Sequence, residues 1–177
     1  KSYDRRVTTL DLIGHMIPMR GPNIFNYVEE DWKEGVRHGL TFGDGSLSGK
    51  SATLHQFGDS KHLVEDFFDS YTETNYTDSG TALTVTKLPA HFKILPESSR
   101  NLSSSYNRGF IAGVIAADGC MDSRGHFMLH NKSKEILSEI RRLAASVGIL
   151  STSIKLVRNI NPWSGAEAPL YKLSFVR

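Results

Sequence analysis

Two stretches of the chain end in the same way: Gly39-Leu40-Thr41-Phe42-Gly43-Asp44-Gly45 and Gly113-Val114-Ile115-Ala116-Ala117-Asp118-Gly119. Each position of the second stretch lies 74 residues after its counterpart in the first, and the same offset relates Gly35 to Gly109. Small residues therefore recur at every fourth position in both copies, at Gly35, Gly39 and Gly43 and at Gly109, Gly113 and Ala117. The chain carries an internal duplication with one aspartate in each copy.

A small residue at every fourth position forms a flat stripe along one side of a helix. Two such stripes let helix backbones approach more closely than large side chains permit. We therefore expect two helices packed in parallel, each ended by an Asp-Gly pair, because glycine is a usual helix stop. This packing brings Asp44 and Asp118 to the same end of the pair. Two carboxylates facing the negative ends of two helix dipoles repel each other, so we expect a divalent metal ion between them.

At this point the residues resemble a family. Residues 111–119, IAGVIAADG, resemble the LAGLIDADG signature of homing endonucleases, with Ala116 where the signature has its first aspartate. Residues 37–45, RHGLTFGDG, resemble a degenerate first copy. The segments Lys93-Ile94-Leu95-Pro96 and Leu143-Ala144-Ala145-Ser146-Val147-Gly148-Ile149 resemble motifs of intein-type members. The resemblance covers about residues 27–177.

The resemblance implies an α+β fold of two pseudo-symmetric αββαββ repeats, residues 27–100 and 101–177. Two central packed LAGLIDADG helices would carry a saddle-shaped pair of antiparallel sheets. Residues 1–26 are expected to form an extended segment or linker, and they resemble the strand and turn that join the splicing part of an intein to an inserted endonuclease.

Local patterns predict elements that fit this plan. In the first copy they predict helices at 27–44 and from Asp59 or Ser60 to Phe68, a strand pair within 47–56, and strands at 81–87 and 90–95. In the second copy they predict helices from Ser103–Ser105 to Gly119 and from Ser133 to Gly148, a hairpin turning at Arg124-Gly125, and strands at 152–160 and 170–176.

The composition limits the class of protein. No apolar run approaches the roughly 18–20 residues that span a bilayer, and no signal-peptide pattern is present. The single cysteine excludes an intrachain disulfide and a cysteine-based zinc site. We expect a soluble, intracellular monomer of the host cytoplasm or nucleoid, without membrane contact. A net charge of +2 does not by itself predict nucleic-acid binding.

The family resemblance assigns the chemistry of phosphodiester hydrolysis to a small set of residues. Asp44 and Asp118 would hold Mg²⁺ (or Mn²⁺), and the backbone carbonyls of Gly43 and Ala117 could complete the ligand set. Lys93 would lie near the scissile phosphate, and by its position near the start of the last strand Lys172 is its counterpart in the second copy. One metal-binding aspartate per repeat would then serve the two strands of DNA.

Recognition would fall to the strands, since a twisted β-ribbon fits the major groove and its alternate side chains reach base edges. The expected partner is double-stranded DNA with a long asymmetric target site. The polar outward candidates are Thr53, His55, Gln56, Thr84, Thr86, Arg124, His126, His130, Lys155 and Arg158. Any one of them could instead belong to a merely solvated sheet face.

Two other interpretations stay open. The degenerate first copy is compatible with a DNA-binding module or an RNA maturase that has lost cleavage. In a purely structural protein the glycine stripes would only pack helices, but two acids at helix ends would then have no purpose.

Overall fold

The computed structural model describes residues 27–77, 80–96, 102–161 and 163–176. The predicted linker at 1–26, with its resemblance to an intein segment, lies outside the described residues. The chain divides into two compact units, one formed by Tyr27–Ala117 and the other by the described residues from Asp118 onward. The predicted boundary between the sequence repeats falls within residues 97–101, which are also outside the described part.

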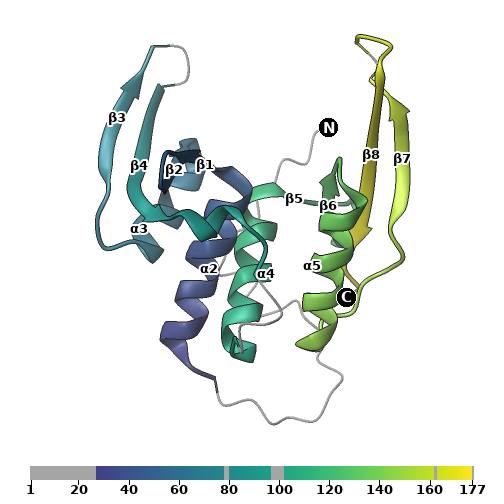
Figure 1. Ribbon diagram of the computed structural model, residues 1–177, viewed down its shortest axis with the longest axis horizontal. Coiled ribbons are helices and arrows are strands. Elements are labelled where there is room, and N and C mark those ends of the chain that lie inside the picture. The colour runs from purple at the N-terminus through teal and green to yellow at the C-terminus, as the bar shows by residue number, and fades with distance from the viewer. Residues whose placement is uncertain (1–26, 78–79, 97–101, 162, 177) are drawn as a thin grey trace. The chain divides into compact units, whose positions relative to one another are not determined.

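The first unit holds two long helices and one sheet (Figure 1). Its elements are α2 (Glu29–Asp44), β1 (Gly45–Ser48), β2 (Ser51–Phe57), η1 (Gly58–Ser60), α3 (Lys61–Phe67), β3 (Thr72–Tyr76), β4 (Gly80–Pro89), η2 (Ala90–Lys93) and α4 (Ser104–Asp118). All strand pairs are antiparallel, and the sheet order is β1-β2-β4-β3.

The second unit repeats this topology. Its elements are β5 (Gly119–Met121), β6 (Phe127–Asn131), α5 (Lys134–Ser146), β7 (Lys155–Ile160) and β8 (Glu167–Ser174). The antiparallel sheet has the order β5-β6-β8-β7, which equals that of the first sheet strand for strand. Two αββαββ repeats with an α+β fold are therefore confirmed. How the two sheets lie relative to each other, and hence the saddle, stays a prediction.

Helix α5 shows why its sequence folds locally as it does. The hydroxyl of Ser133 accepts a hydrogen bond from the Ile136 N–H at 3.1 Å and so caps the helix, as predicted. Leu137, Ile140 and Leu143 recur at helical spacing and are at most 4% exposed. Gly148 follows the helix with φ of +80°, a conformation that glycine adopts without strain. These features hold α5 on its sheet.

One strand prediction is wrong. Residues 90–93 form the 3-10 turn η2 in place of a strand, and the missing strand of the first sheet is β3, which follows α3. Pro89 ends β4, and Phe92 of η2 turns into the core, where it is 2% exposed. The alternation of apolar residues in 90–95 thus reflects one buried anchor within a turn.

Candidate metal and nucleic-acid site

Helices α2 and α4 run parallel and touch through their glycines within the first unit. A methyl group on Gly39 would lie 2.7 Å from Val114 N and 2.9 Å from the Cα of Gly113, and one on Gly113 would lie 2.8 Å from Leu40 N. Gly35 and Gly109 face backbone of the other helix in the same way. Figure 1 shows the two helices side by side. The predicted close packing through small residues is therefore present at these four glycines.

The C-terminal end of α2 gathers three side chains. Asp44 is the last residue of the helix and is exposed. Its Oδ2 accepts a hydrogen bond of 2.8 Å from Nε2 of Gln56, which lies on β2 and is 3% exposed. A buried amide requires partners for its polar atoms, and here the carboxylate supplies one. Gln56 therefore fixes the orientation of Asp44.

Lys93 reaches the same helix end from η2. Its ammonium donates to the carbonyl of Phe42, and Nζ lies 5.8 Å from the centre of the Phe42 ring. Phe42 precedes Asp44 by two residues, so the lysine lies at the negative end of the helix dipole close to the acid. The carbonyl of Thr41 is used by the capping N–H of Gly45. A cation, an acid and an amide thus meet at the end of α2, as the sequence predicted for Lys93 and Asp44 but not for Gln56.

Asp118 ends α4, is exposed, and is followed directly by β5 in the second unit. Lys172 does not lie at the start of the last strand, as we had expected: β8 begins at Glu167, so Lys172 stands near its end. Lys172 pairs with His130 of β6 and with Lys155 of β7. Burial, together with the positive charge of Lys172, lowers the pKa of His130 below its usual value.

Among the polar strand candidates of the first sheet, the structure separates two faces. Thr53 and His55 alternate along β2 with buried Ala52, Leu54 and Gln56, and Thr86 of β4 is exposed. Gln56 is therefore not an outward residue: the period of two places it on the core side.

Thr84 does lie on the face of His55, because the two are cross-strand partners. It is nevertheless only 6% exposed, so the expectation of an exposed side chain is wrong for this residue as well. Its strand is central in the sheet, and its hydroxyl lies 3.0 Å from Nδ1 of His55. The hydroxyl of Tyr76, on the strand that the sequence analysis missed, lies 3.1 Å from the same nitrogen. The alternation of threonine and tyrosine in 72–76 was the signal for that strand.

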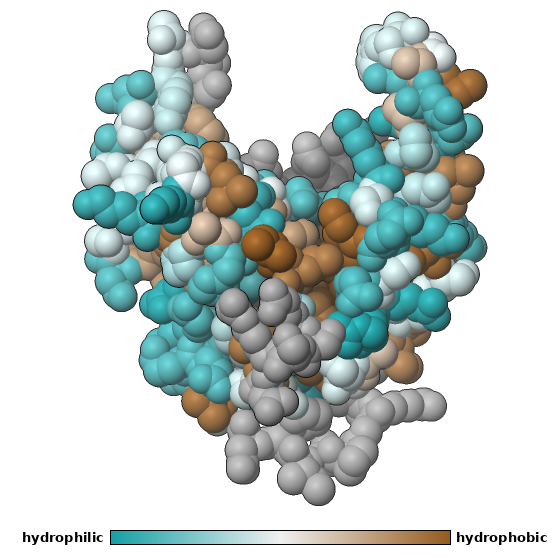
Figure 2. Space-filling view, viewed as in Figure 1, coloured by the Kyte–Doolittle hydropathy of each residue, from teal (hydrophilic) through white to brown (hydrophobic). Residues whose placement is uncertain are grey.

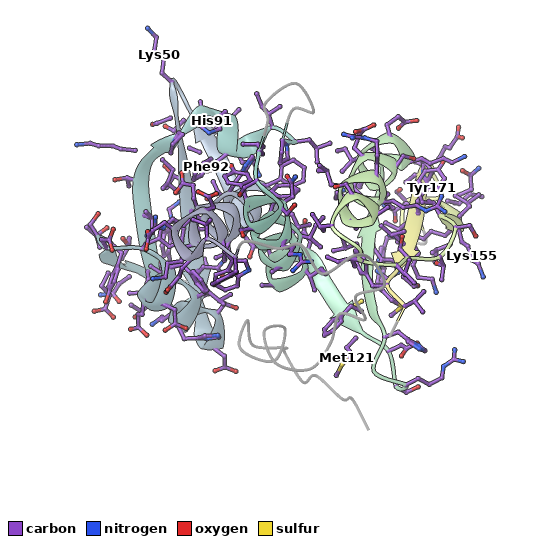
Figure 3. All side chains as sticks on the ribbon, turned by 90° about the horizontal axis from the view of Figure 1, so that it is seen from below. Lys50, His91, Phe92, Met121, Lys155 and Tyr171 are labelled. Atoms are coloured by element: carbon purple, nitrogen blue, oxygen red, sulfur yellow. The ribbon has the colours of Figure 1, made fainter. Side chains whose placement is uncertain are left out.

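The candidates of the second sheet divide between a hairpin turn and a ribbon. In the turn, Asp122 accepts hydrogen bonds from the backbone N–H groups of Arg124 and His126 and lies 3.2 Å from Nδ1 of His126. These contacts, the His126 N–H first among them, lower the pKa of Asp122 to about 2. Along β7, Lys155 and Arg158 are exposed beside the apolar Leu156, Val157 and Ile160, and Figure 2 shows both hydrophilic and hydrophobic colours on this ribbon. Figure 3 shows Lys155 pointing away from the ribbon.

The donor set fits a hard divalent cation. Among the described residues no three His, Cys, Asp or Glu side chains gather at one point. The end of α2 offers one carboxylate together with terminal backbone carbonyls, since the last four C=O groups of a helix lack intrahelical partners. Mg²⁺ suits such a sparse set of oxygen ligands, because it keeps several waters and binds one or two carboxylates and substrate phosphates.

Comparisons with known proteins agree with this fold. Residues 105–162 match the family model of the LAGLIDADG-like domain. A mesophilic variant of the homing endonuclease I-DmoI is similar in structure, with a TM-score of 0.56 and 20% identity over 82% of this chain and 84% of that one. I-DmoI in complex with DNA and Ca has a TM-score of 0.52 and 18% identity, over 82% of this chain and 83% of that one. The N-terminal LAGLIDADG domain of DUF199/WhiA has a TM-score of 0.54 and 12% identity, over 92% and 90%. No curated protein matches the sequence.

None of the helices in the described ranges is long and apolar enough to cross a membrane.

Proposed function

We propose that this chain, which carries a LAGLIDADG-like domain at residues 105–162, is a site-specific DNA endonuclease that makes a metal-dependent double-strand cut by phosphodiester hydrolysis. The observation that carries the proposal is the end of α2, where Asp44, Gln56 and Lys93 meet. The fold is shared with I-DmoI, which has been solved with its DNA and Ca, Mn or Mg.

Asp44 and Asp118 would each bind Mg²⁺ or Mn²⁺, with the carbonyls of Gly43 and Ala117 as further ligands. The parallel course of α2 and α4 supports this, because Asp44 follows Gly39 by as many residues as Asp118 follows Gly113. When bound, the metal would neutralise charge on the phosphate and lower the pKa of an attacking water.

The chain's own residues would hold and orient these groups. Gln56 donates to one oxygen of Asp44 and so fixes how the carboxylate turns. Lys93 places a positive charge at the same helix end, where it would stabilise the developing negative charge of the phosphoryl group. We assign Lys172 the corresponding role in the second repeat, on the same sheet face as His130.

The outer sheet faces would bind double-stranded DNA with a long asymmetric site, and one copy of the chain would suffice because both repeats lie in it. Thr53, His55 and Thr86 in the first sheet, and Lys155, Arg158 and His130 in the second, would contact DNA. Arg124 and His126 would do so from the β5–β6 turn. An origin within an intein also belongs to this proposal, on the resemblance of its motifs alone.

The test begins with duplexes selected from a randomised library by binding to the protein without metal. Selected duplexes in a plasmid are then incubated with Mg²⁺ or Mn²⁺ and the wild type, Asp44→Asn or Asp118→Asn. We expect cleavage to fall by at least about 10²-fold in each variant, the scale of losing one electrostatic stabiliser of the transition state, while affinity for DNA is kept. Asp59→Asn removes the same charge from an exposed acid on η1 and should cleave like the wild type. Undiminished cutting by Asp44→Asn would reject the proposal.

A second function has support in the comparison with DUF199/WhiA. Because a LAGLIDADG domain of that protein shares the fold over 92% of this chain, the fold alone does not decide for cleavage. Specific binding of duplex with no nicking at any metal concentration would identify a DNA-binding module, and preference for folded RNA would identify a maturase.

A further inference from the structure

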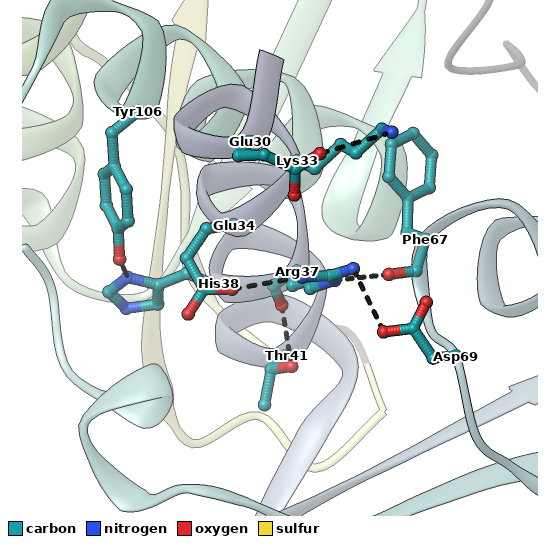
Figure 4. Close-up of polar contacts among 9 residues, drawn as sticks. All are labelled: Glu30, Lys33, Glu34, Arg37, His38, Thr41, Phe67, Asp69 and Tyr106. Atoms are coloured by element: carbon teal, nitrogen blue, oxygen red, sulfur yellow. Dashed lines mark hydrogen bonds and ion pairs between the residues drawn. The ribbon is translucent and has the colours of Figure 1, made fainter. Parts of the chain in front are cut away.

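A buried histidine joins both long helices to the turn that carries Lys93. His38 of α2 is 2% exposed. Its Nδ1 lies 2.7 Å from the hydroxyl of Tyr106 on α4, and its Nε2 lies 2.8 Å from the carbonyl oxygen of Ile94. Figure 4 shows the tyrosine directed at the imidazole. All of these groups belong to the first unit.

The two contacts determine the tautomer. A carbonyl oxygen only accepts hydrogen bonds, so the proton of the neutral ring must sit on Nε2. Nδ1 then accepts the proton of the Tyr106 hydroxyl. Tyr106 therefore fixes which nitrogen of His38 donates to Ile94.

Aromatic packing fixes the ring plane as well. Phe92 stacks on His38 with ring centres 4.9 Å apart and planes 11° apart, and Phe110 of α4 meets it edge to face at 4.9 Å. Phe92 is itself 2% exposed. In Figure 3 Phe92 is labelled beside His91 on the same turn.

The residues held by His38 are the two neighbours of Lys93. One imidazole stacks on residue 92 and bonds the carbonyl of residue 94, so the backbone on both sides of the lysine is anchored to α2. Lys93 in turn donates to the carbonyl of Phe42, in the last turn of the same helix. Its side chain has rotatable bonds in plenty, so a fixed ammonium position needs a fixed backbone.

We infer that His38 is a positioning residue for Lys93, with Tyr106 setting its tautomer from α4. The inference rests on the proposed function for its effect on cleavage. His38 does not touch substrate, because it is buried and both ring nitrogens face protein groups. It links the second motif helix to the lysine of the first repeat.

A bland role is the alternative: the imidazole fills core volume, and any ring of that size would serve. The variant His38→Phe separates the two, because it keeps a ring to stack on Phe92 and removes both hydrogen bonds. Tyr106→Phe removes one hydroxyl and leaves the bond to Ile94. Val64→Ala serves as the control, since Val64 is fully buried on α3 and forms none of these contacts.

The first readout needs neither DNA nor metal. The protein is acetylated for short times with an N-hydroxysuccinimide ester, and peptides are quantified by mass spectrometry, with exposed Lys50 as reference. Figure 3 shows Lys50 reaching away from the protein. We expect Lys93 to react more slowly than Lys50 in the wild type, and the ratio of Lys93 to Lys50 to rise several-fold in His38→Phe. Val64→Ala should leave the ratio unchanged at temperatures below its melting transition.

The second readout is cleavage. His38→Phe should lower the rate of the cleavage step by about 10–10²-fold without changing the Kd for DNA, since a misplacement of about 1 Å can cost 10²-fold. In a Lys93→Met background the same substitution should change the rate less than about twofold, because the group it positions is gone.

The outcomes separate the two proposals. An unchanged acetylation ratio in folded His38→Phe overturns the inference, and so does an equal rise in Val64→Ala. An equal loss of cleavage with and without Lys93 overturns it too. If His38→Phe does not fold, Tyr106→Phe decides by the same readouts. A changed ratio with no cleavage by the wild type rejects the endonuclease and leaves the positioning role standing.

Discussion

Replacing Gly39 by alanine adds one methyl group where α2 and α4 are in backbone contact. The new carbon would lie 2.7 Å from Val114 N and closer still to the carbonyl of Phe110, whereas ordinary contacts begin at 3.4 Å. The obstacles are backbone atoms, so no side chain can rotate away. The helices must therefore separate by at least about 0.7 Å, the shortfall at Val114 N.

Two opposing contributions set the size of the effect. Alanine is favoured over glycine in a helix by about 1 kcal/mol. Against this, a gap of 0.5–1 Å forfeits a quarter to a half of each dispersion contact across it. Val36, Leu40, Phe110 and Val114 line the interface and are at most 2% exposed, so all four lose contacts. We expect a net destabilisation of about 2–4 kcal/mol, as for strong overpacking of a core.

The assay is denaturation by urea and by heat, followed by circular dichroism. For a chain of this size the melting temperature should fall by about 5–15 °C. Gly49→Ala is the control: it makes the same change in the unfolded chain at a position with nothing within 4 Å, though φ there is +62°. It should cost about 1–2 kcal/mol from backbone strain alone.

The double variant Gly39→Ala/Gly113→Ala sharpens the test. The Cα of each glycine lies 2.9 Å from the methyl position of the other, so separation forced by the first methyl makes room for the second. The double variant should cost clearly less than the sum of the single variants. An alanine at Gly39 that leaves stability unchanged or raises it, or costs that simply add, would refute the close-packing argument.

Three further predictions concern other parts of the chain. Gln56→Ala should lower the cleavage rate about 10–100-fold with little change in the Kd for DNA, because it removes the donor that orients Asp44; equal rates in a plasmid assay would contradict this. Asp122 has a pKa lowered to about 2 in the folded state, so it stabilises the fold above its unfolded pKa near 4. Asp122→Asn should therefore be less stable than the wild type at pH 6, and urea titrations should show the difference vanishing as the pH falls from 4 to 2. Ser133→Ala should lose about 1 kcal/mol of stability with the cap of α5, measured by urea unfolding.

The sequence predicted the repeat topology because its strongest signals are local and duplicated. Glycines at every fourth position specify a helix face, and the Asp-Gly pairs specify where α2 and α4 end. Helix α5 carries a hydroxyl cap and an apolar face in a single continuous segment. Such patterns need no knowledge of distant residues, and the structure has these helices within one or two residues of the predicted ends.

The turn η2 shows what local patterns miss. An alternation of apolar residues in 90–95 is compatible with a strand, and only the packing of Phe92 on His38 and the bond from His38 to Ile94 hold the segment as a turn. These partners lie more than 50 positions away along the chain. Lys93 was identified because a motif marks it, but the reason for its position is not in the motif.

The duplication also misleads when it is taken as chemical symmetry. Gly45 pairs with Leu54, and Gly119 pairs with Leu129, so Gln56 and Asn131 occupy equivalent places two residues further along β2 and β6. Gln56 reaches the acid of its repeat, whereas the shorter Asn131 accepts a hydrogen bond from the Ser133 N–H at 2.8 Å and helps start α5. Backbone register survives the divergence of two copies because every strand residue contributes to it. The partner of a single acid depends on the length of one side chain, so that each half of the proposed site must be argued from its own contacts.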